Sequence, residues 1–151
     1  MTSMSEKPEV DLRPATASDS RFAFNVKKAA LGAYIAETYG WDEAEQRRLH
    51  EERFRASRTQ IIGWEGMDVG LLATDEIDDR IRLQQLFVLP HAQNQGIGSL
   101  VLARVLQSAN VTGRPVCLQV LKSNPRARAF YERNGFALTG ETETHYGLKR
   151  S

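Results

Sequence analysis

Apolar and polar residues along the chain follow two kinds of repeat, and the repeat in each segment predicts its secondary structure. Alternation at every second position is typical of half-buried strands, and spacing of three to four residues is typical of helices. The strand-like segments are residues 10–16, 59–65, 68–78, 80–90 and 115–121, with two further strands around a turn within 136–150. The helix-like segments are residues 18–39, 41–58, 97–110 and 124–134.

Capping and breaking residues bound these elements. Gly40 stops the first helix, and Pro90 ends the strand of residues 80–90. Asn124 with Pro125 opens the last helix. The apolar residues that recur at helical spacing in the first helix are Phe22, Val26, Ala29, Ala30, Ala33 and Tyr34.

The order of the elements predicts a mixed α/β layer fold. Short connections between the early strands favour antiparallel hairpins, whereas helices between the later strands imply parallel crossovers. With 151 residues, the chain fits one domain. We expect that domain over residues 10–151, after a flexible tail at residues 1–9 that lacks the apolar core of a signal peptide.

Composition narrows the class of protein. The formal net charge of +1 argues against a nucleic-acid partner, and the arginine-rich segment 41–58 interleaves acids with bases as a solvated helix face does. RNA binding by that segment is the alternative. No apolar run approaches the ~20 residues that cross a bilayer, so we expect no membrane partner.

Cysteine usage bears on the compartment and on the chemistry. Cys117 is the one cysteine, so no internal disulfide can form, and a cytoplasmic location is the simplest expectation. Cys117 lies in an apolar strand segment, which predicts a buried structural thiol and disfavours a covalent route through it. We expect no metal site.

The segment "HAQNQGIGSL", residues 91–100, places two glycines at the start of a predicted helix. Such a turn presents unpaired N–H groups and the positive end of the helix dipole to a phosphate, or it is simply a tight turn that needs positive φ. A dinucleotide fingerprint needs a small residue where Val101 stands, and a P-loop needs a lysine where Ser99 follows Gly98. Both of these nucleotide motifs fail.

Two blocks together resemble the GNAT superfamily of acyl-CoA-dependent N-acetyltransferases. The first, Gln93-Asn94-Gln95-Gly96-Ile97-Gly98, is similar to the family's Gln/Arg-x-x-Gly-x-Gly/Ala turn. The second, "NPRARAFYERNGF" over residues 124–136, resembles its Asn-x-x-Ala-x-x-x-Tyr-x-x-x-Gly-Phe signature. The resemblance implies a mostly antiparallel, twisted sheet of six or seven strands with splayed central strands and about four helices.

The same resemblance implies acetyl-CoA as the cofactor and assigns roles to residues. The backbone of residues 86–88 would pair with the pantetheine arm, and the amides of residues 95–99 with the Gln93 side chain would take the phosphates. Tyr131 would act as general acid toward the leaving thiolate. The residues implied for the cofactor are Leu86, Phe87, Val88, Gln93, Asn94, Gln95, Gly96, Ile97, Gly98, Ser99, Asn124, Ala127 and Arg128, with Arg126 as a second arginine for the phosphates.

The acceptor side is less determined. Some family members carry a glutamate base on the strand before the glycine turn, but "RIRLQQLF" over residues 80–87 has no acid. Glu37, His145 or a water molecule stays open as the base. Residues implied for the acceptor are Tyr34, Glu37, Trp41, Gln85 and His145, with Tyr39 and Tyr146 beside them.

The sequence therefore predicts direct acetyl transfer to a primary amine in a ternary complex, with a small molecule as the favoured acceptor. A protein or peptide acceptor is the alternative, as is a non-catalytic acyl-CoA-binding module on the same fold. Because chains of this fold often pair, a homodimer also stays open.

Overall fold

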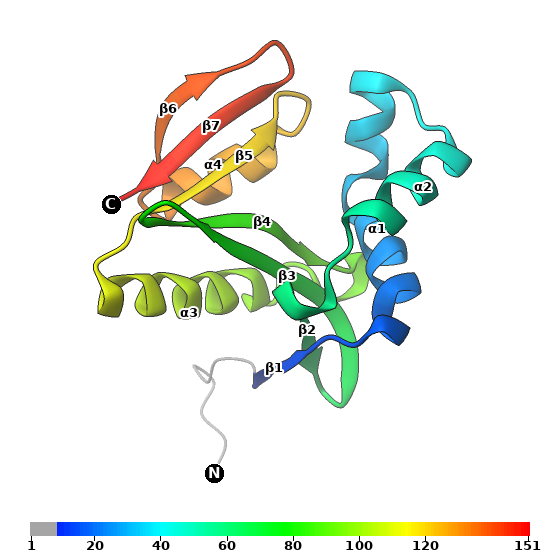
Figure 1. Ribbon diagram of the computed structural model, residues 1–151, viewed down its shortest axis with the longest axis horizontal. Helices are drawn as coiled ribbons and strands as arrows, with labels where there is room; N and C mark the ends of the chain where they lie inside the picture. Colours follow the sequence, from blue (N-terminus) through cyan, green and yellow to red (C-terminus); the bar gives the residue numbers. More distant parts are fainter. Residues whose placement is uncertain (1–8) are drawn as a thin grey trace.

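The computed structural model describes residues 9–151, and Figure 1 shows one mixed sheet with helices packed on it. Residues 1–8 of the expected tail lie outside the described residues. The strands are β1 (Val10–Pro14), β2 (Thr59–Trp64), β3 (Met67–Ile77), β4 (Arg80–Val88), β5 (Val116–Leu121), β6 (Ala137–Glu141) and β7 (His145–Arg150). The helices are α1 (Ser20–Tyr39), α2 (Glu43–Arg53), α3 (Ile97–Thr112) and α4 (Pro125–Arg133), with short 3-10 turns η1 (Ala17–Asp19), η2 (Ala56–Arg58) and η3 (Pro90–Ala92).

The sheet has seven strands in the order β1-β2-β3-β4-β5-β7-β6. Every neighbouring pair is antiparallel except β4 with β5, which is parallel and joined by the α3 crossover. The expected mixed, mostly antiparallel sheet with four α-helices is therefore confirmed. Among the described residues, no helix combines the length and hydropathy of a membrane span.

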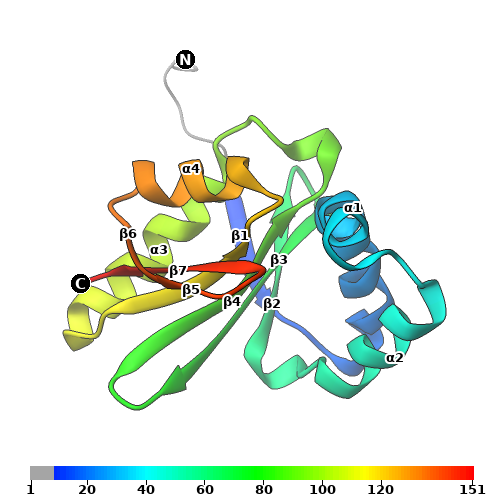
Figure 2. The ribbon, with the colours of Figure 1, turned by 90° about the horizontal axis from the view of Figure 1, so that it is seen from above.

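Two apolar clusters hold helices on opposite faces of the sheet. The larger cluster joins α3 and α4 to the sheet through residues such as Val101, Leu118 and Tyr131. The smaller cluster joins α1 to the other face and includes Val26 and Leu71. Figure 2 shows this division, with α1 and α2 beside the β2–β4 half and α3 and α4 on the opposite side.

Helix α1 buries a narrower stripe than its apolar residues suggested. The buried side chains are Ala23, Phe24, Val26 and Ile35, whereas Ala29 and Ala33 are exposed. Alanine has the highest intrinsic helix propensity, so these two stabilise the helix without packing against the sheet.

Helix α2 ends at Arg53, five residues before the end of the predicted segment 41–58, because Phe54 is extended. Its arginines pair with acids of the same helix: Arg48 with Glu45 at 2.5 Å and with Glu52 at 2.6 Å. This is the solvated, charge-balanced face that the interleaved sequence indicated.

The thiol of Cys117 is half-buried, so the expectation of a fully buried side chain was wrong. Along β5 the neighbours Val116 and Leu118 point into the large core, and Cys117 therefore points to the opposite face.

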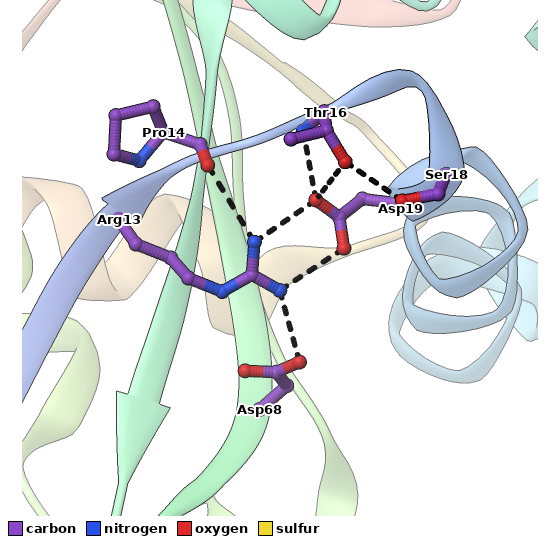
Figure 3. A network of polar contacts seen from close by, with 6 residues as sticks. All are labelled: Arg13, Pro14, Thr16, Ser18, Asp19 and Asp68. Atoms are coloured by element: carbon purple, nitrogen blue, oxygen red, sulfur yellow. Dashed lines mark hydrogen bonds and ion pairs between the residues drawn. The ribbon is translucent and has the colours of Figure 1, made fainter.

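A polar network fixes the turn that leads from β1 into α1 (Figure 3). Arg13 donates to both carboxylate oxygens of Asp19, at 2.9 and 3.0 Å, and to Asp68 on β3 at 3.1 Å. Asp19 also accepts from the backbone N–H of Thr16 at 2.8 Å. The guanidinium of Arg13, followed by the Thr16 N–H, lowers the pKa of Asp19 from 3.8 to about 2.

We expect Asp19→Ala to lower the free energy of unfolding at pH 7 by about 1–3 kcal/mol, because a charge-assisted network is lost. Since the pKa of Asp19 is depressed in the folded state, its stabilisation is complete above pH 3.8 and disappears as the pH falls through about 2. Urea unfolding of the wild type and of Asp19→Ala from pH 6 to pH 2 should show the difference between their free energies of unfolding decrease. A difference in the free energy of unfolding that stays constant across this range would show that the Asp19 carboxylate does not supply the stabilisation. At pH 7 the stability of the control Asp19→Asn should lie between those of the wild type and Asp19→Ala.

Candidate active site

Strands β4 and β5 part soon after they meet. They pair only at Ile81 with Val116 and at Arg82 with Cys117, and the Ile81 N–H donates to the Pro115 carbonyl at 2.9 Å. Beyond this point both strands continue without pairing to each other. The expected splay is therefore present, and each strand keeps an edge whose main-chain polar groups need another partner.

The hydrogen bonds between β3 and β4 show which main-chain groups of β4 face the gap. The Leu89 N–H donates to the Val69 carbonyl at 2.7 Å, and a Cβ placed on Gly70 would lie 2.2 Å from the Phe87 carbonyl oxygen. Phe87 and Leu89 thus direct their main-chain groups toward β3. Because these groups alternate along a strand, those of Leu86 and Val88 point into the gap.

A bulge in β4 separates the side chains of this segment. Ala73 pairs with Gln85 but the next residue, Thr74, pairs with Leu83, so Gln84 is the extra residue. As a result, Leu83 faces the large core, whereas Gln85 two positions later shares the α1 side with Phe87.

The glycine turn leads directly from this strand into α3. Asn94 has φ 63° and Gly96 has φ 81°, and no side chain caps the helix. The first helical bond runs from the Leu100 N–H to the Gly96 carbonyl at 3.0 Å. The N–H groups of residues 97–99 therefore have no acceptor within the helix and can bind an anion.

Side chains from two elements hold this turn. Gln93 donates from Nε2 to the Val88 carbonyl at 2.8 Å, and Arg126 on α4 donates to Asn94 Oδ1 at 2.8 Å. Gln93 and Asn94 therefore shape the turn itself. Gln95 and Ser99 are exposed beside it, and Ile97 is buried beneath it.

The structure brings Arg126 to the turn and places Arg128 elsewhere. The Arg128 guanidinium lies 4.3 Å from the ring centroid of Tyr146 and 3.4 Å from Glu132. Lys122 lies on the same ring at 5.2 Å. Sequence spacing could not separate the two arginines, because both follow the cap of one short helix.

The second block of the signature forms the cap of α4, the helix itself and the turn after it. Asn124 accepts from the Ala127 N–H at 3.1 Å, which caps the helix. Tyr131 is 8% exposed and packs edge-on against Phe130 and Phe136. Burial raises the pKa of the Tyr131 phenol above its usual value, so the hydroxyl stays protonated at neutral pH.

The C-terminal end of α1 is tied across the gap to the β5 and β7 side. Thr38 donates to the Ser123 hydroxyl at 2.9 Å, and Ser123 donates to the Tyr34 carbonyl at 3.0 Å. The Tyr39 hydroxyl donates to Thr144 at 3.0 Å, and the Thr144 hydroxyl lies 2.8 Å from Nδ1 of His145. Tyr34 and His145 are thus brought to one end of the site. The roles of Thr38, Ser123 and Thr144 were not visible in the sequence.

The remaining acceptor candidates are dispersed. Trp41 donates to Glu43 at 2.9 Å and packs against Phe24 and Lys28, so it belongs to the α1–α2 junction. Glu37 is exposed on α1, and Gln85 is half-buried on the α1 side of β4. Within residues 9–151, no three His, Cys, Asp or Glu side chains gather as metal ligands.

The turn and both splayed strands fall within a known family domain. The chain matches the acetyltransferase (GNAT) domain over residues 55–138, a little over half of its length. It therefore belongs to this family.

Similar proteins agree with the family. The chain is 36% identical over 66 residues to "Probable N-acetyltransferase Rv2775" of Mycobacterium tuberculosis, a match that spans 44% of this chain and 37% of that protein. The fold is similar to PaiA N-acetyltransferase of Thermoplasma acidophilum in complex with coenzyme A, with a TM-score of 0.77, 14% identity, and coverage of 95% of this chain and 99% of that chain. It is also similar to Arabidopsis thaliana Naa50 in complex with the bisubstrate analogue CoA-Ac-MVNAL, with a TM-score of 0.68, 20% identity, and coverage of 94% and 98%. At these identities the two structures support the fold alone.

The two glycines of the turn should respond differently to alanine. Gly96→Ala forces a side chain to φ 81°, which costs roughly 1–2 kcal/mol. At Gly98 the added Cβ would lie 3.7 Å from Phe130, an ordinary contact inside a helix, so Gly98→Ala should be neutral or slightly stabilising. Chemical denaturation measures both variants. Equal losses in the free energy of unfolding for the two variants would show that the turn does not require a glycine at the left-handed position 96.

Proposed function

We propose that this protein transfers the acetyl group of acetyl-CoA to a primary amine by direct attack in a ternary complex. The parting of β4 from β5, which opens toward the uncapped start of α3, carries this proposal. An extended amide-bearing arm can pair with the main-chain groups of Leu86 and with the Val88 N–H, while a diphosphate binds the N–H groups at the turn.

The turn fits a diphosphate through backbone rather than side-chain groups. The Gln93 amide already donates to Val88, so residues 95–99 offer main-chain N–H groups as the principal donors. The Arg126 guanidinium beside Asn94 adds positive charge at the same place.

The transfer itself needs one acid and one proton acceptor. The amine lone pair attacks the thioester carbonyl, the C–S bond breaks, and the thiolate takes a proton as it leaves. Tyr131, protonated and buried in the large core beneath the sheet, donates that proton or a hydrogen bond to the sulfur. The proton released by the amine passes to water, with Glu37 and the His145 ring as the candidate side chains.

Tyr131→Phe tests whether the protein is an enzyme or an acyl-CoA-binding module. Loss of the acid should lower kcat by about 10²–10⁴-fold, and the dissociation constant of acetyl-CoA should stay within about twofold because the ring is retained. Release of CoA thiol and isothermal titration measure the two quantities. Unchanged turnover would exclude Tyr131 as the acid, and no turnover in the wild type with any amine would favour the binding module.

The closed end of the site favours a small acceptor over a peptide. Two connections, Thr38 to Ser123 and Tyr39 to Thr144, tie α1 to the β5 and β7 side. An extended peptide that entered between these segments would have to break them. The alternative, a peptide or protein acceptor, is suggested by the peptide-bearing analogue bound to Naa50.

A panel of small primary amines and short peptides with free N-termini distinguishes the two acceptor classes. The wild type should have the higher kcat/KM with a small amine. Tyr39→Phe removes the hydrogen bond to Thr144 and keeps the ring. It should raise kcat/KM with peptides severalfold and so reduce the difference in kcat/KM between small amines and peptides. If peptides are already the better substrates of the wild type, the acceptor is a peptide or protein.

A further inference from the structure

Four strands place a row of polar side chains on the face of the sheet away from α3 and α4. Asp75 on β3 pairs with Arg82 on β4, Arg82 with Cys117 on β5, and Cys117 with Lys149 on β7. Directly paired residues point to the same face. The row therefore crosses the point where β4 and β5 begin to part.

Asp75 holds the guanidinium of Arg82 in a fixed orientation. Arg82 donates from Nε to Oδ1 at 3.0 Å and from Nη2 to Oδ2 at 2.6 Å, and Gln84 donates to Oδ2 at 3.0 Å. Arg58 lies 3.6 Å from the same carboxylate, whose side chain is 7% exposed. A bidentate ion pair of this kind leaves the other edge of the guanidinium free and already oriented.

The free edge of Arg82 faces solvent beside a second cation. Nη1 of Arg82 has no hydrogen-bond partner within residues 9–151, and the side chain is 43% exposed. Lys149 is exposed two strands away, about 10 Å across the sheet. Cys117 between them is short and half-buried. Two arginines and a lysine against one carboxylate leave this part of the face with excess positive charge.

This excess positive charge would bind an anionic group if the acceptor amine carries one. We propose that Arg82 and Lys149 form an anion subsite above Cys117 that binds a carboxylate or phosphate carried by the acceptor amine. This inference rests on the proposed acetyl transfer and narrows its substrate class to small amines with an anionic group at the other end. Arg82 binds the anion, Asp75 positions Arg82, and the amine extends along β4 toward Leu86.

The experiment compares ω-amino carboxylates of increasing length with their carboxamides, and aminoalkyl phosphates with the matching amino alcohols. In the wild type the anionic member of a pair should have the lower KM, with one preferred chain length. Arg82→Gln should raise KM for the anionic amine by on the order of tenfold or more, with kcat and the KM of the neutral partner unchanged. Whichever anion shows the larger difference identifies the group.

Two further variants guard this result against a general effect of the substitution. Lys149→Gln should raise KM for the anionic amine by a smaller factor than Arg82→Gln. Because it leaves the Asp75–Arg82 pair intact, it also tests the subsite if Arg82→Gln does not fold. Arg133→Gln, an exposed change on α4 behind the sheet, should alter nothing. Equal KM values for anionic and neutral amines in the wild type, or equal effects of Arg82→Gln and Arg133→Gln, would overturn the subsite.

Failure of the proposed function gives a different result. If no amine leads to release of CoA thiol, acetyl transfer is wrong, and the subsite is judged by binding alone. The anionic amine should then still raise the midpoint of thermal unfolding of the wild type more than its neutral partner, and Arg82→Gln should abolish that difference. No difference in the wild type would overturn the subsite as well.

Discussion

The separation of β4 from β5 is the constraint on which the rest of the structure depends. A parallel pair that stops after two residues on each strand leaves main-chain N–H and C=O groups without partners in the middle of a sheet. Such groups are costly to bury unpaired, so the gap must stay open to solvent or receive a ligand that supplies hydrogen bonds. The neighbouring elements keep it open. β3 holds one side of β4, β7 holds the far side of β5, and α3 and α4 pack beneath both strands through the large core.

The same separation explains why different elements meet at one place. The bulge at Gln84 turns Gln85 and Phe87 to the α1 side, while Leu86 and Val88 keep their side chains in the large core and their main-chain groups toward the gap. The strand then passes through η3 into the left-handed turn at Gly96, so the open helix start lies at the end of the open strand edge. The end of α1 and the Thr144–His145 segment limit the space on the other side.

Local patterns in the sequence were sufficient for the elements, their order and the turn, because each depends on residues close together in the chain. The cap at Asn124 and the left-handed Gly96 are of this kind. Features that depend on strand register were not predictable. The pairing of Asp75 with Arg82, the half-exposure of Cys117 and the placement of Arg126 rather than Arg128 at the turn require knowing which residues lie opposite one another. Trp41 was implied for the acceptor by its place at the junction of the first two helices, and its ring does pack at that junction, against Phe24.

Amide chemical shifts of the ¹⁵N-labelled protein during titration with acetyl-CoA test the central claim most directly. We predict the largest changes at the N–H groups of Leu86, Val88, Gly98 and Ser99, which come from the open strand edge and the first turn of α3. If these four resonances do not move while others shift, for example around the cavity of about 470 Å³ lined by Ser20, Arg47 and His50, the parted strands do not bind the cofactor.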